Sequence, residues 1–227
     1  MSAPQFAFED VCGGYGGSIV VRGVSGAVAA GEVLCVLGRN GVGKSTLLRL
    51  LHGFLPLARG RVRYAGRDLA GLDPARRAAL GISFAPQERI VFEDLTVREN
   101  LSLMRAGRPP EALARFPRLA ERLGQRAGTL SGGERKLLSL VRVLAEARPV
   151  ALLDEPSEGV QAENVRAMAA LIGERKAAGA AFVIVEQNLA LVEAVADRYL
   201  ILDQGRVVRD GAREGLRRAE LAAHLGI

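Results

Sequence analysis

The chain has 227 residues, of which 49% are hydrophobic and 25% charged, values typical of a globular protein with one full core. No apolar run approaches the roughly 20 residues that a membrane-spanning helix needs, and the N-terminus lacks the basic and apolar segments of an export signal. Cys12, Cys35, His52 and His224 have no spacing typical of a zinc site or a disulfide framework. We therefore expect reduced thiols and a cytoplasmic location.

The net charge of +6 raises the question of an anionic partner. Arginines are scattered and often stand beside glutamates, and only 4% of the residues are aromatic, which leaves few rings for stacking on bases. A solvated basic face near anionic lipid head groups explains the charge better than a nucleic acid does. We expect a protein at a membrane surface and no nucleic-acid partner.

Residues up to about 67 form short apolar stretches separated by glycines, which predicts an antiparallel β layer with one helix inserted. Residues 32–37 are a nearly continuous apolar run, suited to a buried parallel strand. The segment that follows fits G-x-x-x-x-G-K-[ST], in which backbone N–H groups surround phosphate oxygens, Lys44 supplies a charge and Ser45 binds Mg²⁺. A glycine-rich turn is the alternative, but a strand before the loop and a helix at 46–51 give the context of a nucleotide site. The predicted ATP-binding loop consists of Gly38, Arg39, Asn40, Gly41, Val42, Gly43, Lys44, Ser45 and Thr46.

From about residue 88 to residue 147 the pattern becomes helical. Thr96 and Glu99 have the spacing of a capping box ahead of apolar positions in 101–104. The two prolines at 109–110 separate this predicted helix from the next.

A second capping box predicts a helix over residues 132–144, with Ser131 before it and Glu134 in its first turn. A helix start does not require Gly132 and Gly133, because glycine lowers helix stability. Two glycines there leave backbone N–H groups open to an anion, which predicts a second phosphate contact.

Residues 150–153 form another apolar strand, and Asp154 and Glu155 follow it at the edge where open α/β sheets bind ligands. Asp154 would hold the hydration shell of Mg²⁺, and Glu155 would orient and polarise an attacking water. The alternative for Asp154 is a cap on the segment beyond Pro156. Further strands are predicted over 181–185, 199–202 and, after a turn at 203–205, 206–208.

The segment Leu130-Ser131-Gly132-Gly133-Glu134 resembles the signature of ABC-type ATPases, and the resemblance extends from about residue 6 to residue 211. It implies an α/β fold of the P-loop NTPase class, ABC ATPase type, with a mostly parallel core sheet, an N-terminal antiparallel β layer and a small α-helical subdomain. The single domain 1–227 would divide into a nucleotide-binding core, about 1–87 and 149–227, and a helical subdomain, about 88–148. ATP and Mg²⁺ would bind, and the signature of one subunit (Ser131, Gly132, Gly133 and Glu134) would cover the γ-phosphate held by its partner.

The same resemblance implies roles for single residues. Gln87 resembles the glutamine that contacts magnesium and senses the membrane partner, and Tyr15 resembles the aromatic residue that stacks on adenine, or else is an ordinary turn residue. Gln187 occupies the switch-histidine position, or else caps a helix at 188–196, and Gln161 occupies the D-loop aspartate position. These two departures leave room for a pair of sites of which one hydrolyses poorly. Catalytic roles are thus implied for Glu155, Gln187 and Lys44, and metal binding for Ser45, Gln87 and, through water, Asp154.

A finer resemblance, carried by residues 91–101, 155–161 and 185–188, is to the ATP-binding subunits of branched-chain and hydrophobic amino acid importers. Residues 158–161 also resemble urea and amide importers, so the substrate stays open. The implied partners are a second, non-identical ATPase and two permeases at the cytoplasmic face of the inner membrane, with a periplasmic binding protein acting indirectly. A soluble ABC protein acting on DNA or ribosomes usually carries a second cassette or a long coiled coil, and a P-loop kinase does not explain the signature.

Overall fold

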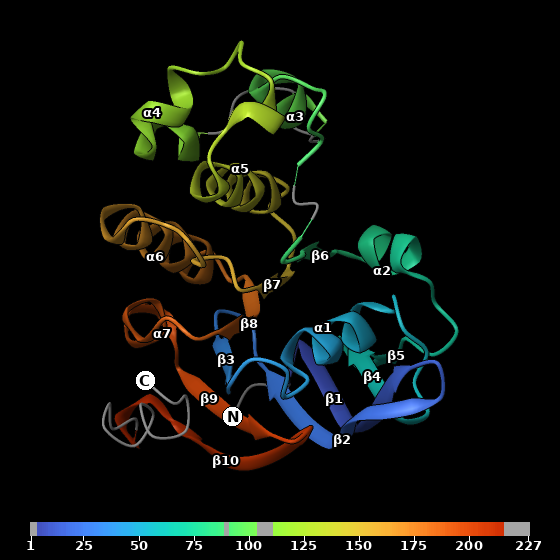
Figure 1. Ribbon diagram of the computed structural model, residues 1–227. Helices are drawn as coiled ribbons and strands as arrows, with labels where there is room; N and C mark the ends of the chain where they lie inside the picture. Colours follow the sequence, from blue (N-terminus) through green and yellow to red (C-terminus); the bar gives the residue numbers. More distant parts are fainter. Residues whose placement is uncertain (1–3, 89–90, 104–110, 216–227) are drawn as a thin grey trace.

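The computed structural model describes residues 4–88, 91–103 and 111–215, and arranges them as two sheets with covering helices (Figure 1). The larger sheet has the order β10-β9-β3-β8-β7-β6, and all its neighbours are parallel except β9 and β10. Its strands are β3 (Val33–Leu37), β6 (Ile82–Ala85), β7 (Val150–Asp154), β8 (Ala181–Glu186), β9 (Arg198–Asp203) and β10 (Arg206–Ala212). The strands predicted at 32–37, 150–153, 181–185 and 199–202 are confirmed to within one residue at each end.

The predicted antiparallel layer is the smaller sheet, with the order β2-β1-β4-β5. Its strands are β1 (Phe6–Tyr15), β2 (Ser18–Val28), β4 (Arg59–Tyr64) and β5 (Arg67–Asp68). The prediction of short strands is wrong for β1 and β2, which have 10 and 11 residues. Their pairing shifts register between Phe8 and Val11 and twice more beyond. Bulges therefore keep β1 and β2 paired along a segment whose glycines predicted separate short strands.

Alternate residues of β3 face two different cores. Leu34 and Val36 pack with α1 and the antiparallel sheet, whereas Val33, Cys35 and Leu37 pack with helices on the opposite face. All five residues are fully buried, as a continuous apolar strand with both faces covered requires. The helices that cover the larger sheet are α1 (Lys44–His52), α5 (Gly132–Ala145), α6 (Ala162–Ala177) and α7 (Leu189–Val195), and α2 (Pro74–Leu80) precedes β6.

The remaining helices stand beyond α5, away from both sheets (Figure 1). They are α3 (Val97–Ser102), η1 (Glu111–Arg115), α4 (Pro117–Ala120) and η2 (Ala127–Thr129), and η3 (Arg213–Gly215) follows β10. Both predicted capping boxes are present, at Thr96–Glu99 and Ser131–Glu134. The helix α3 is shorter than predicted: it ends at Ser102, and Leu103 is 53% exposed. Met104 and the prolines at 109–110 lie outside the described residues. No helix in the described part of the chain is long and apolar enough to cross a bilayer.

His52, the last residue of α1, is buried and packs against two aromatic rings that also contact each other. Its ring centroid lies 5.1 Å from that of Phe54 and 5.2 Å from that of Phe84. Its Nε2 lies 3.4 Å from the carbonyl oxygen of Ile82, and its Nδ1 has no partner among the described residues. Burial lowers the pKa of His52 to about 4, because an apolar environment disfavours the imidazolium form.

This pKa predicts an acid-sensitive stability. Between pH 6.5 and pH 4 the unfolded imidazole binds a proton that the folded protein does not, so the free energy of unfolding falls by about 3 kcal/mol as the pH drops. We predict that His52→Phe, which keeps a stacked ring, flattens this part of the curve. Urea unfolding of both proteins at about pH 7 and about pH 4.5 measures the difference, and an equal loss in both would contradict the prediction.

Candidate functional site

The predicted phosphate loop runs from the carboxyl end of β3 into the first turn of α1, which begins at Lys44. Gly43 is the N-cap residue of α1, with φ of 106°, a conformation that glycine adopts without strain, and no side chain caps the helix. The first turn also contains no acidic residue. Its N–H groups and the positive end of the helix dipole therefore face the loop uncompensated, as an anion site requires.

Lys44 lies inside this loop and is buried. Its Nζ donates hydrogen bonds to the carbonyl oxygens of Gly38 at 2.9 Å and Arg39 at 3.0 Å. It also lies 3.3 Å from Oε1 of Glu155, with which it forms an ion pair. The ammonium thus stands where the loop and the end of β7 meet.

Asp154, the last residue of β7, faces the loop as well. Its Oδ1 accepts a hydrogen bond from Ser45 Oγ at 2.9 Å, whereas its Oδ2 is buried without a partner among the described residues. Burial raises the pKa of Asp154 to about 6; the Ser45 hydroxyl opposes this rise and the charge of Glu155 adds to it. The helix beyond Pro156 takes its N-cap from Gln161, so Asp154 is not its cap. An unpartnered carboxylate oxygen beside a hydroxyl fits a magnesium ion, which usually takes one or two carboxylates together with phosphate oxygens.

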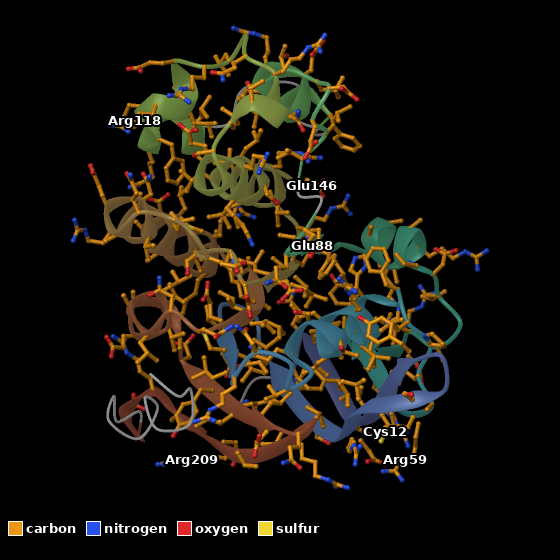
Figure 2. All side chains as sticks on the ribbon, viewed as in Figure 1. Cys12, Arg59, Glu88, Arg118, Glu146 and Arg209 are labelled. Atoms are coloured by element: carbon orange, nitrogen blue, oxygen red, sulfur yellow. The ribbon has the colours of Figure 1, made fainter. Side chains whose placement is uncertain are left out.

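The carboxylate of Glu155 forms hydrogen bonds with two other predicted residues, Gln87 and Gln187. Its Oε1 accepts a hydrogen bond from Gln187 Nε2 at 2.9 Å, and its Oε2 accepts one from Gln87 Nε2 at 2.9 Å. The side chain is buried, and the backbone has φ of 46°, a region that residues other than glycine adopt only at an energetic cost. Glu88, the residue after Gln87, lies where the chain leaves the end of β6 (Figure 2).

Gln187 contacts other residues of the predicted site and does not cap the next helix. Its Nε2 also donates to Oδ1 of Asn40, in the phosphate loop. The cap of α7 is Asn188, whose Oδ1 accepts from the backbone N–H of Ala190 at 3.0 Å. The alternative role for Gln187 is therefore wrong.

Tyr15 lies apart from these contacts, at the end of β1 before the turn at Gly16 and Gly17. Its side chain is 44% exposed, and its hydroxyl accepts a hydrogen bond from Arg49 Nη1 at 2.8 Å. Both residues line a cavity of about 540 Å³. The stacking of its ring on adenine stays a prediction.

The signature segment lines a cleft of about 950 Å³, together with Gln87, Glu158 and Gln161. None of the phosphate-loop residues 38–46, all of which the structure describes, lines this cleft. The two signature glycines differ in their surroundings. A Cβ on Gly133 would lie 2.8 Å from the carbonyl oxygen of Gly159, whereas a Cβ on Gly132 would meet nothing within 4 Å. The fold of this chain therefore explains Gly133 and leaves Gly132 free for a contact from outside.

The sequence analysis missed three charged residues next to the site: Lys136, Glu158 and Glu186. Glu186 is 2% exposed, and its Oε1 accepts from the backbone N–H of Ser157 at 2.9 Å and its hydroxyl at 2.6 Å. Its Oε2 accepts from the backbone N–H groups of Gln187 at 2.9 Å and Asn188 at 3.0 Å. A carboxylate at the end of an otherwise apolar strand was the available signal, because such a group must find hydrogen-bond donors.

Comparison with known proteins gives matches along the chain. A family model described as ABC transporter matches residues 21–158. The high-affinity branched-chain amino acid transport ATP-binding protein BraG of Pseudomonas aeruginosa is 37% identical over 214 residues, 90% of this chain and 91% of BraG. The hemin import ATP-binding protein HmuV of Streptomyces coelicolor is 38% identical over 86% of this chain and 74% of HmuV. The mycobactin import ATP-binding/permease protein IrtB of Mycolicibacterium smegmatis is 36% identical, over 95% of this chain and 39% of IrtB.

Two solved structures of ATP-binding proteins from ABC transporters are similar to this chain in fold. An ATP-binding subunit of an ABC transporter superposes with a TM-score of 0.85 at 27% identity, covering 98% of this chain and 100% of that one. A nucleotide-free ATP-binding cassette from an ABC transporter gives a TM-score of 0.80 at 27% identity, covering 99% and 96%. The family model spans more than half of the chain, and BraG is similar along almost its whole length, so the chain belongs to the ABC transporter family and is one of its ATP-binding, ATP-hydrolysing members.

Proposed function

We propose that this chain is the ATPase subunit of an importer for branched-chain or other hydrophobic amino acids. The observation that supports this substrate class is the coverage of BraG, in which 91% of the relative and 90% of this chain align. Hemin and mycobactin importers reach similar identity but align over a smaller share of their own length. A urea or amide importer is the alternative, favoured by the resemblance of residues 158–161, and a soluble ABC protein acting on nucleic acid is the weaker one.

The site supports ATP hydrolysis through a division of labour among its side chains. The uncapped N-terminus of α1 and Lys44 would bind the phosphates, and Ser45, Asp154 and Gln87 would hold Mg²⁺. Bound magnesium neutralises charge that develops on the phosphates. Glu155, held by its neighbours at the end of β7, would orient the attacking water and polarise it.

ATPase subunits of ABC importers work with transmembrane permeases, and we propose the same for this chain at the cytoplasmic face of the inner membrane. Residues 88–148 would form the helical subdomain that docks on the permeases, and residues 1–87 and 149–227 the nucleotide core. Gly132 and its neighbours would cover ATP held by a second ATPase, which we expect to be a different chain. Gln161 and Gln187 would then leave room for two unequal ATP sites, of which one hydrolyses poorly.

The role of Glu155 predicts a separation of binding from turnover. Glu155→Gln leaves the phosphate loop and Asp154 intact, so it should bind Mg-ATP but lower turnover of the assembled transporter by about 10²- to 10⁴-fold. Lys44→Ala removes a charge-assisted phosphate contact and should lose binding itself. The thermal shift caused by Mg-ATP measures binding, and phosphate release measures turnover. Wild-type hydrolysis by Glu155→Gln would show that another group activates the water.

The two signature glycines provide a matched pair of variants. Gly132→Ala has space for its methyl group and should keep the melting temperature, but should lower turnover of the assembled transporter by obstructing the partner's phosphate. Gly133→Ala forces its Cβ against Gly159 and should lower the melting temperature as well. Thermal melts and ATPase rates distinguish the two effects. Full turnover in Gly132→Ala would contradict the proposed contact.

Uptake experiments test the substrate class. Deleting the gene in its host should abolish high-affinity uptake of radiolabelled leucine, isoleucine and valine, and should leave urea and hemin uptake unchanged. The wild-type gene should restore uptake, and the Glu155→Gln gene should not. Loss of urea uptake with leucine uptake intact would replace the proposal by its alternative.

A further inference from the structure

Lys136 is a buried lysine in a chain that has only three, the others being Lys44 and Lys176. It lies on α5, two residues after the signature segment, and is only 9% exposed. A buried ammonium destabilises a protein unless hydrogen bonds replace its hydration. The contacts of Lys136 therefore show which part of the chain is bound by α5, the helix that begins at the signature and is called the signature helix below.

The ammonium of Lys136 binds the turn that carries Glu155. Its Nζ donates to the carbonyl oxygen of Glu155 at 3.0 Å and lies 3.4 Å from Oε2 of Glu158. The same carbonyl oxygen accepts the backbone N–H of Glu158 at 3.3 Å, which closes the turn. Lys136 thus holds the main chain at the residue with φ of 46°, where the backbone needs support.

The other supports of this turn come from β8. The backbone N–H of Glu155 donates to the carbonyl oxygen of Val185 at 3.0 Å, and Glu186 binds both the N–H and the hydroxyl of Ser157. These contacts stay within the sheet edge. Lys136, in contrast, comes from the helix that begins at the signature, so it ties the position of that helix to the turn.

Glu158 brings Gln87 into the same network. Its Oε2 accepts from Gln87 Nε2 at 3.2 Å, and Gln87 Nε2 also donates to Glu155 Oε2 at 2.9 Å. Both the main chain and the carboxylate of Glu155 therefore have partners outside the strand that carries it. The Lys136 contact joins the main chain of Glu155 to the helix that begins at the signature.

We propose that Lys136 is a positioning residue, which directs the carboxylate of Glu155 by holding its carbonyl oxygen and which makes this direction depend on the placement of the signature helix. The inference rests on the proposed role of Glu155 in activating water. When the signature helix moves, the ammonium moves with it, and the turn from Glu155 to Glu158 follows. Misplacement of a reacting group by about 1 Å can lower a rate by about 10²-fold, so a main-chain anchor has a measurable effect.

Lys136→Met is the decisive variant. It keeps the apolar stem and removes the ammonium, and the carbonyl oxygen of Glu155 keeps the N–H of Glu158. The side chain of Glu158 is 57% exposed, so water can replace its lost partner. Lys176→Met is the matched control, because Lys176 pairs with Asp197 and, in the described part of the chain, forms no hydrogen bond or ion pair with Glu155 or Glu158.

In the assembled transporter, Lys136→Met should lower kcat for ATP by about tenfold or more, with KM and the Mg-ATP thermal shift changed by less than about twofold. Amide hydrogen exchange should rise at Ser157 and Glu158, and Lys136→Gln, which keeps a donor, should recover part of kcat. Lys176→Met should change none of these quantities. Because Glu155→Gln already removes the positioned group, adding Lys136→Met to it should cause no further loss of kcat.

Two results would overturn the inference: a kcat for Lys136→Met equal to that of Lys176→Met, or a parallel loss of kcat, nucleotide binding and melting temperature in both Lys136→Met and Lys136→Gln. The second would show that Lys136 only stabilises the fold. The underlying proposal fails separately, since wild-type turnover in Glu155→Gln alone would remove Glu155 from water activation whatever Lys136 does.

Discussion

The parallel pairing of β3, β8 and β7 is the constraint on which the site depends. Leu37 pairs with Glu186, and Asp154 pairs with Val185, so the phosphate loop, Gln187 and Glu155 all begin within a residue or two of one sheet edge. Side chains alternate between the two faces of a sheet, so a slip of one residue would exchange the residues that face the two cores and would displace these groups along the edge. The apolar residues that fix this register are buried on both faces, and the same packing that stabilises the fold therefore aligns the site.

Charges concentrate at this edge, and their burial is compensated by specific partners. Lys44 binds two loop carbonyls, Glu186 accepts four hydrogen bonds, and Lys136 donates to the Glu155 carbonyl. Buried groups paired in this way are tolerated, whereas unpaired ones destabilise. The exception is Asp154 Oδ2, together with the left-handed backbone of Glu155. Local features that lower stability are expected where a protein binds or reacts, and both lie where the metal and the attacking water would be.

Much of this arrangement could be predicted from the sequence, because its signals are local. Apolar runs located the central strands, and the spacing of Ser131 and Glu134 located the start of α5. The bulged pairing of β1 with β2 was missed, since register depends on the partner strand. Contacts such as Ser157 with Glu186 and Lys136 with Glu155 were missed for a related reason: they join segments far apart in the chain, and no periodicity marks which polar groups will meet. The close approach of Gly133 to Gly159 is of the same kind.

Lys44 would connect nucleotide binding with the pairing of the Glu155 carboxylate, because its ammonium contacts both the phosphate loop and Glu155. An ammonium has three N–H donors, and those of Lys44 face the carbonyls of Gly38 and Arg39 and the carboxylate of Glu155. In the proposed function a phosphate must take at least one of these donors. The ion pair with Glu155 is the longest of the three contacts, at 3.3 Å, and a phosphate offers the ammonium a more concentrated negative charge than the carboxylate does. Binding of the nucleotide and release of Glu155 toward water would then be one event, so that the carboxylate stays paired whenever no phosphate is present.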